Sequence, residues 1–322
     1  MRDPTERAEA EPSPEHGVGN AGEAWPRLPY EEWKETYETL HMWTQIVGKI
    51  RLTLSPMINH WWNVTLYVTP RGLTTSTIPY AANHGVKTFE IEFDFIDHSL
   101  AVHTSEGATR YMSLHPRTVA DFYRELMSIL HSLGIKVKIN TTPQEVPNPI
   151  ACDVDTQHAS YDEEYANRFW SILVLSDNVF KEFRGDFIGK CSPVHFFWGS
   201  FDLAVTRFSG RRAPEKPKAD HIQREAYSHE CISAGFWPGS GSLLAPAYYA
   251  YASPAPEGIS KAQVGPDDAH FDKKMGEFIL LYDDVRNAAD PRAALLDFLQ
   301  TTYAASADLA GWDRPSLERQ RA

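Results

Sequence analysis

Two histidines, each followed by two aromatic residues, are the side chains of this sequence best suited to chemistry. His60 begins the word His60-Trp61-Trp62, and His195 begins the word His195-Phe196-Phe197. A buried imidazole can act as a general base or a general acid near neutral pH, or it can bind a metal through a neutral nitrogen. Core histidines that bond only to backbone atoms leave the same pattern, so a structural role is the alternative.

Polar residues that follow these words extend the candidate centre. Asp202 comes soon after His195 among aromatic residues, where burial raises the pKa of a carboxyl group. Its alternative is the ordinary aspartate of a turn beside Gly199-Ser200. His229 and Glu230 face opposite sides of a strand unless the strand is bulged. We take His60, His195 and Asp202 as the candidate catalytic residues.

A metal is the second chemistry that these residues allow. The candidate ligands are His60, His195, His229 and Glu230. Nitrogen and oxygen ligands favour zinc, iron or manganese over copper(I). The sequence identifies no cofactor beyond this divalent-metal hypothesis.

Aromatic residues are numerous enough to build the walls of a small-molecule pocket. The chain has nine tryptophans, 16 phenylalanines and 14 tyrosines. Aromatic walls with a few convergent polar groups are typical of ligand sites, although filling the core is an alternative use for the same rings. The candidate binding residues are Trp62, Trp198, Arg207 and Tyr227.

Composition narrows the class of protein further. The chain has 322 residues and a formal charge of -12, so its surface repels nucleic acid and anionic lipid. Only three cysteines occur, far apart, which predicts a reducing cytoplasm and no disulfide scaffold. The sequence lacks the GxxxxGK(S/T) motif of phosphate-binding loops, the HExxH motif of zinc proteases and the GxSxG motif of α/β-hydrolases. It also lacks the glycine motif that binds dinucleotides after a strand. We therefore expect a small-molecule ligand, no nucleic acid and no membrane, with a homo-oligomer left open.

Hydrophobic periodicity predicts the elements that must position these residues. Helices are expected over 30–47 with Gly48 as terminator, behind Pro116, over 162–187, and from a cap at Asp290. Strands are expected at 60–68, 89–95, 100–103, 110–114, 135–139, 194–208, 227–236, 247–252 and 278–283. Residues 89–95 alternate most clearly, with Glu90, Glu92 and Asp94 on a face that we interpret as solvated. The fold class is α+β, with antiparallel sheets that carry long helices on one side.

Short sequence motifs repeat in the same order in the two halves of the chain and predict an internal duplication. In each half, a glycine-lysine pair, a serine-proline pair, a histidine with two aromatics, and a proline-arginine pair follow one another in the same order. The halves are residues 25–150 and 151–312, flanked by a disordered acidic tail at 1–24 and a loose tail at 313–322. Longer loops at 210–225 and 253–272 of the second half are expected to cover a shared pocket. Coincidence among common turn residues is the alternative.

Four stretches of the chain resemble an uncharacterised bacterial protein family of unknown function. They are Trp25-Pro26-Arg27-Leu28-Pro29-Tyr30, Leu40-His41-Met42-Trp43-Thr44-Gln45-Ile46-Val47-Gly48-Lys49, Asn59-His60-Trp61-Trp62 and Ser192-Pro193-Val194-His195-Phe196-Phe197-Trp198-Gly199-Ser200-Phe201-Asp202-Leu203. The resemblance spans most of residues 25–312. It implies no activity, cofactor or catalytic residue.

From the residues themselves we expect a cytosolic enzyme that acts on a small organic molecule. Its pocket is expected between the two halves, with histidine acid–base chemistry or a metal bound by histidine and carboxylate. Two alternatives stay open: a non-catalytic small-molecule-binding protein, and a subunit of a homo- or hetero-oligomeric assembly.

Overall fold

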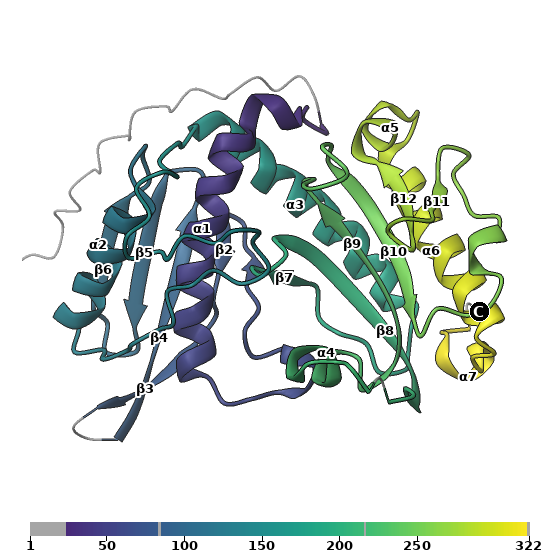
Figure 1. The fold of residues 1–322 in the computed structure, drawn as a ribbon, viewed down its shortest axis with the longest axis horizontal. Helices are drawn as coiled ribbons and strands as arrows, with labels where there is room; N and C mark the ends of the chain where they lie inside the picture. The colour runs from purple at the N-terminus through teal and green to yellow at the C-terminus, as the bar shows by residue number, and fades with distance from the viewer. Residues whose placement is uncertain (1–23, 83–84, 216, 321–322) are drawn as a thin grey trace, which may run out of the picture.

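Helices and strands follow one another in two series, each built around one sheet (Figure 1). The computed structural model describes residues 24–82, 85–215 and 217–320, so the predicted acidic tail at 1–24 lies outside the described residues except for its last position. Among the helices of these ranges, none combines the length and the apolar character that a membrane span requires.

The first series consists of a long helix, an antiparallel sheet and a second helix. Helix α1 carries Glu31 and Glu32 in its first turn, where carboxylates favour the helix dipole, and no proline interrupts it. The sheet has the strand order β1-β2-β4-β5-β6, and β3 also pairs with β4. The elements are α1 (Tyr30–Leu54), η1 (Asn59–Trp61), β1 (Tyr67–Val68), β2 (Gly72–Thr74), β3 (Ile78–Ala82), β4 (Gly85–Asp94), β5 (Ser99–Thr104), β6 (Thr109–Ser113) and α2 (Val119–Ser132).

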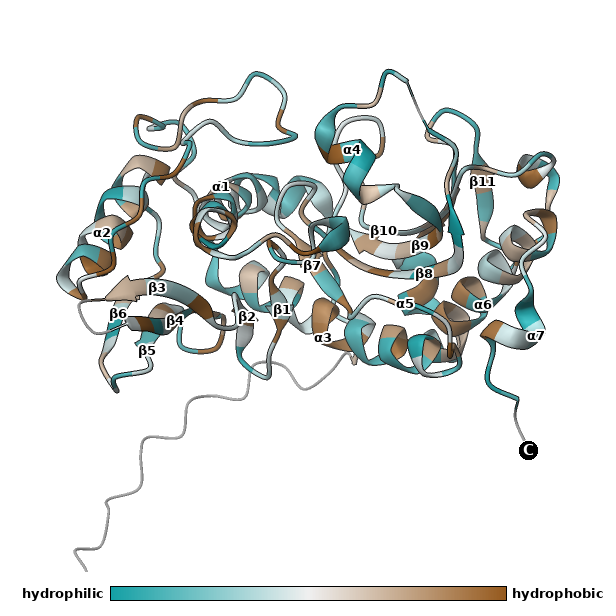
Figure 2. Ribbon diagram, turned by 90° about the horizontal axis from the view of Figure 1, so that it is seen from below, coloured by the Kyte–Doolittle hydropathy of each residue, from teal (hydrophilic) through white to brown (hydrophobic). Residues whose placement is uncertain are grey.

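The second series begins with another long helix and a second antiparallel sheet of order β11-β12-β10-β9-β8-β7. Figure 2 shows α3 and α6 on one face of this sheet and α4 on the other. The elements are α3 (Glu163–Gly185), β7 (His195–Phe197), β8 (Asp202–Arg212), α4 (His221–Ala226), β9 (His229–Trp237), β10 (Ala247–Ser253), η2 (Ile259–Lys261), β11 (His270–Asp272), β12 (Glu277–Leu281), α5 (Tyr282–Asn287), α6 (Pro291–Leu309) and α7 (Arg314–Leu317).

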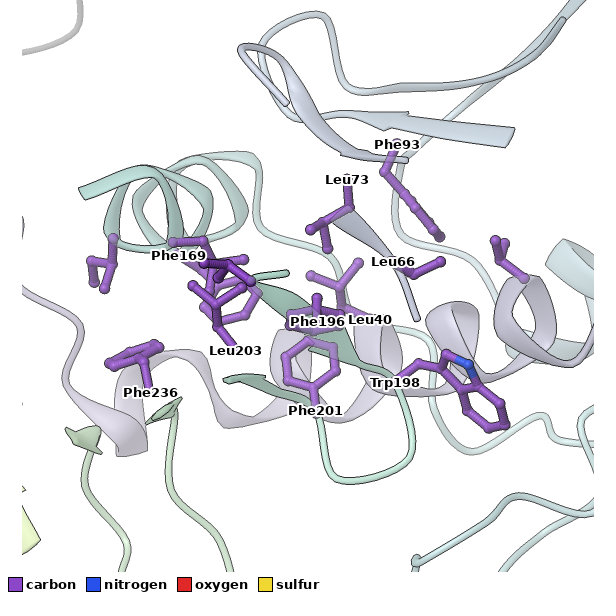
Figure 3. Packing of buried hydrophobic residues seen from close by; sticks show 14 of the residues in the cluster. Leu40, Leu66, Leu73, Phe93, Phe169, Phe196, Trp198, Phe201, Leu203 and Phe236 are labelled. Carbon is purple, nitrogen blue, oxygen red and sulfur yellow. The ribbon is translucent and has the colours of Figure 1, made fainter. Parts of the chain in front are cut away.

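One continuous core joins the two series. Leu66 and Phe196 exchange two backbone hydrogen bonds of 2.8 and 2.9 Å, which tie the chain before β1 to β7. Around this bridge, Leu40 of α1, Phe169 of α3 and Leu203 of β8 pack in the same buried cluster (Figure 3). Burial of such large apolar side chains is the main favourable contribution to folding. This shared core therefore holds the segments between the two sheets in fixed positions.

The predicted fold class is confirmed. Both sheets are antiparallel, and long helices pack on one side of each. The alternating stretch forms β4, with Phe89, Ile91 and Phe93 buried. Asp290 caps α6 as predicted, because its side chain accepts a hydrogen bond from the backbone of Ala293.

Several predicted boundaries are wrong. Gly48 does not end the first helix, which continues to Leu54. Residues 135–139 form no strand, and residues 60–68 hold a short 3₁₀ turn and only the two-residue β1. The predicted strand 194–208 is a hairpin of β7 and β8, because the chain reverses at residues 198–201. At the C-terminus, where a loose tail was predicted, Glu318 bridges to Phe187 and α7 forms.

The internal duplication stays a prediction. Among the described residues, each series has a long helix, six strands and a following helix, in agreement with the predicted order. The matched words differ in local structure, however: His60 lies in a 3₁₀ turn with φ of 60°, whereas His195 begins a strand.

Candidate functional site

A cavity of about 750 Å³ opens on the face of the second sheet opposite α3 and α6. Its walls come from segments far apart in the chain: η1, the loop at Gln144 and Glu145, the β7–β8 turn and α4. This volume is in the range of small-molecule sites. Of the two long loops predicted to cover the pocket, 210–225 contributes through His221, Ile222 and Gln223, whereas 253–272 provides no lining residue.

Alternate residues of four neighbouring strands form the floor of this cavity. Because side chains of a strand alternate between faces, one row of each strand points to the same side. The strand register places Thr206 opposite Ser233, and Ser233 opposite Tyr251. The floor residues are Asp202, Ala204, Thr206 and Phe208 of β8, Cys231, Ser233 and Trp237 of β9, Tyr249 and Tyr251 of β10, and Glu277 of β12.

Asp202 is the most deeply buried carboxyl group of the floor, with 7% of its surface exposed. Ser200 Oγ donates a 2.5 Å hydrogen bond to one carboxylate oxygen, and the Tyr249 hydroxyl donates to the other. Tyr249 reaches Asp202 across β9 at Gly235, where an added Cβ would lie 2.4 Å from the tyrosine hydroxyl. Burial raises the pKa of Asp202 despite these two bonds.

Two further carboxyl groups line the same cavity. Glu277 lies half-buried in the floor, and Glu145 is an exposed residue whose carboxylate lies against Gly199. Burial, with the negative charges of Asp202 and Asp272, raises the pKa of Glu277 to about 7. Desolvation and Asp202 also raise the pKa of Glu145. Within the described part of the chain, the lining residues include no lysine and no arginine.

The raised pKa of Glu277 predicts a pH-dependent stability. In the folded protein Glu277 keeps its proton up to about pH 7, whereas an unperturbed glutamate loses it near pH 4.5. The folded state thus binds more protons between these values, so the free energy of unfolding falls as pH rises through this window. We expect Glu277→Gln to raise that free energy by about 1–2 kcal/mol at pH 8 and to change it little at pH 4.

Urea unfolding at both pH values measures this effect. Glu257→Gln, at an exposed position of the loop before η2, is the matched control and is expected to change little at either pH. An equal effect of Glu277→Gln at pH 4 and pH 8 would contradict the prediction.

Helix α1 holds the turn that presents Asp202. His41 Nε2–H donates to the carbonyls of Trp198 and Gly199 at 3.0 and 2.9 Å. Gln45 Nε2 donates to the Gln144 carbonyl at 2.8 Å, and its Oε1 accepts from the Gln144 amide at 2.9 Å. The turn and the loop of Glu145 are therefore fixed on one helix, beside each other. His41 therefore holds the turn in place rather than facing a ligand.

Phe201 gives the turn its shape. Its φ is 59°, a left-handed backbone conformation that bulky residues rarely adopt. Its fully buried ring stacks on Phe169 with centroids 5.1 Å apart. This burial offsets the local strain and fixes the start of β8 at Asp202.

His60 lines the cavity, but both of its ring nitrogens are engaged. Nδ1–H donates to the carbonyl of Ala226 at 3.1 Å, and Nε2 accepts from Lys190 Nζ at 2.7 Å. Burial and the neighbouring Lys190 lower the pKa of His60. The imidazole is thus neutral and joins η1 to α4, and Glu225 strengthens the same contact by accepting from the His60 amide at 3.0 Å.

His195 lies outside the cavity lining. Only 1% of it is exposed, and neither ring nitrogen has a hydrogen-bond partner. Its ring is packed between Trp62 and Tyr67, with centroids 5.8 and 5.5 Å away. Burial lowers its pKa to about 3. The two histidines therefore flank Trp62, with His60 on the cavity side and His195 in the core.

The candidate binding residues divide between the two faces of the second sheet. Trp62, Trp198 and Tyr227 line the cavity, and the Tyr227 and Tyr251 hydroxyl groups lie 3.0 Å apart. Arg207 lies on the opposite face, because it alternates with Thr206 along β8. Its guanidinium carbon stands 3.4 Å from the ring centre of Phe183, and it donates to the Phe183 carbonyl. Arg207 thus packs the sheet against α3.

The predicted metal ligands are spread over three environments. The His229 ring lies 5.7 Å from that of His60, outside the cavity lining. Glu230 accepts hydrogen bonds from Ser209 and Arg211. In the ranges that the structure describes, no three histidine, cysteine or carboxylate side chains gather as a metal site. Metal binding stays a prediction, which elemental analysis of the purified protein tests.

Sequence reasoning missed Glu277 and Glu145 as site residues. Glu277 directly precedes the predicted strand 278–283, and Glu145 lies in a proline-bearing segment outside every predicted helix and strand. The available signal in the sequence was the alternation of Tyr249 and Tyr251, which places both rings on the cavity face of one strand.

The fold and the cavity define an α+β protein with a cavity lined by aromatic and acidic residues. The chain belongs to a family of unknown function, DUF5996, whose model matches residues 25–319. This match confirms the resemblance to an uncharacterised family. Comparison with curated proteins gives no significant match, and comparison with solved structures gives none either.

Proposed function

We propose that this protein is a cytosolic enzyme that binds a small organic molecule in the cavity and transfers protons to or from it. The observation that carries the proposal is the position of Asp202, a buried carboxyl group on the floor of a cavity, bonded to Tyr249 and Ser200. A carboxyl group with a raised pKa is suited to general acid–base catalysis near neutral pH.

The surrounding residues have distinct roles in this proposal. Asp202 is the proton-transfer group, and Tyr249 and Ser200 orient its two oxygens. Glu277, which titrates near pH 7, is a second group able to donate or accept a proton. His60 is a positioning residue, because hydrogen bonds already engage both of its nitrogens. The predicted pair of catalytic histidines is thus replaced by carboxyl groups.

Conversion of a metabolite mixture tests the catalytic proposal. Purified protein is incubated with a cell-free small-molecule extract, and compounds are followed by mass spectrometry. We expect the wild type to consume at least one compound and form a product, and Asp202→Asn to lose most of this turnover. Asp283→Asn, at an exposed position of α5, is the matched control and should behave like the wild type.

A wild-type protein that converts nothing, or an Asp202→Asn variant that converts at the full rate, would contradict the catalytic role. Circular dichroism of each variant separates loss of turnover from loss of folding.

A non-catalytic binding protein is the second candidate function. It is favoured by the hydrogen bonds that already satisfy His60 and both Asp202 oxygens inside the protein. In the same assay this function predicts retention of a compound on the protein without product.

The sparse use of cysteine, three residues in 322, supports the proposed cytosolic location. A subunit role in an oligomer stays a prediction, and the mass in solution as a function of concentration tests it.

A further inference from the structure

The cavity gathers three carboxyl groups in a lining that offers them no lysine or arginine partner in the described part of the chain. These groups are Asp202, Glu145 and Glu277. The hydrogen bonds to Asp202 come from two neutral hydroxyl groups. Lys190, the cation bonded to His60, is not a lining residue and instead packs over the rings of Trp62 and Phe208, 5.4 and 4.9 Å from their centres.

Aromatic rings surround these carboxyl groups. The nine phenylalanine, tyrosine and tryptophan residues of the lining are Trp61, Trp62, Phe197, Trp198, Phe208, Tyr227, Trp237, Tyr249 and Tyr251. The faces of such rings carry negative potential and attract organic cations, most strongly where water is excluded. Their edges and faces also accommodate apolar groups of a ligand.

The two features select the same ligand chemistry. A carboxylate in a partly desolvated site repels an anionic ligand and forms a charge-assisted hydrogen bond with an ammonium group. A cavity of about 750 Å³ is too large for a bare ammonium ion and suits a molecule with an apolar body.

We infer that the ligand of this cavity is an organic cation: a protonated or quaternary amine that carries an aromatic or other apolar group. The amine lies against Asp202 and Glu277, and the apolar group lies among the tryptophan rings. This inference rests on the proposed small-molecule function and specifies its substrate class.

Three probes of one shape and different charge test the inference by isothermal titration calorimetry. Tryptamine is cationic, tryptophol is its neutral counterpart, and indole-3-acetate is anionic. We expect tryptamine to bind the wild type at least about tenfold more tightly than either of the others. Asp202→Asn and Glu277→Gln should each reduce this preference, and Asp283→Asn should retain it. Glu277→Gln keeps the test decisive if Asp202→Asn fails to fold.

The outcomes separate this inference from the proposed function. Tryptophol or indole-3-acetate binding as tightly as tryptamine would overturn the inferred charge of the ligand and leave a small-molecule function intact. Tryptamine binding that is unchanged in both cavity variants would overturn the site, and no binding by any probe at millimolar concentration would overturn the inference. The proposed catalytic function is tested separately, and absence of turnover in the metabolite assay would contradict it.

Discussion

Gly48→Ala is expected to destabilise the protein by about 2 kcal/mol or more, although alanine is the better helix former. Gly48 lies inside α1, where the Trp198 indole packs directly on its backbone. A Cβ at this position would lie 2.2 Å from the indole ring, closer than real Cβ contacts allow. The ring is 5% exposed, and its Nε1–H donates to the Val64 carbonyl at 2.8 Å.

The substitution therefore forces the indole away from α1 and toward the cavity that it lines. The cost includes the overpacking, the lost indole hydrogen bond and the changed cavity wall, and it exceeds the helix propensity gained. Urea unfolding measures the loss in free energy. Calorimetric titration with tryptamine, where it binds the wild type, measures the effect on the site.

Gly185→Ala is the matched control, because Gly185 is also a helical glycine but nothing lies within 4 Å of its added Cβ. It should be neutral or slightly stabilising. A second test combines Gly48→Ala with Trp198→Leu, which removes the clash and should recover part of the loss. A Gly48→Ala variant as stable as Gly185→Ala would contradict close packing between α1 and the β7–β8 turn.

Arg51→Met is expected to lower the free energy of unfolding by about 3–5 kcal/mol. Arg51 is 7% exposed in the last turn of α1, and its Nε donates to the Asn63 carbonyl at 2.9 Å. Its Nη1 donates to the carbonyls of Thr65 and Thr75. Methionine fills a similar volume but leaves three carbonyl groups without this donor. Removal of the buried positive charge of Arg51 is favourable, but it offsets only part of the cost of the three lost hydrogen bonds.

The same arginine also supports the candidate site indirectly. It fixes the chain just after η1, so its loss should loosen the cavity wall that carries His60 and Trp62. Urea and thermal unfolding give the stability, and amide hydrogen exchange over residues 59–75 locates the loosening. Arg292→Met, which removes an exposed ion pair with Glu182, is the control and should cost less than about 1 kcal/mol. A similar small cost for Arg51→Met would contradict the proposed role of Arg51 in fixing the backbone of residues 63–75.

The fold class could be predicted from the sequence because local patterns determine most of its elements. Alternation at residues 89–95 marks β4, and the aspartate-proline pair at 290–291 marks the start of α6. Gly48 misled the prediction, since glycine usually weakens a helix but here makes room for Trp198. That contact joins residues 150 positions apart, and local propensity carries no signal of it.

The candidate site was predicted only in part, for a related reason. Asp202 was selected from its aromatic surroundings and lies in the cavity, and Trp62, Trp198 and Tyr227 line it as well. His60 lies in the wall, but its partners Lys190 and Ala226 come from distant segments. His195 and Arg207 were selected by type and spacing, yet they face the protein interior and the opposite side of the sheet.

The sequence by itself determined the α+β class, the positions of the long helices and of several strands, and the supply of aromatic and acidic residues, because these follow from composition and short-range periodicity. Only the tertiary structure decided which of those residues meet. The pairing of β8, β9, β10 and β12 brings Asp202, Tyr249 and Glu277 to one face, and helix α1 places Glu145 beside them. Strand register and helix packing are set by contacts between distant residues, whose free energies no local pattern contains.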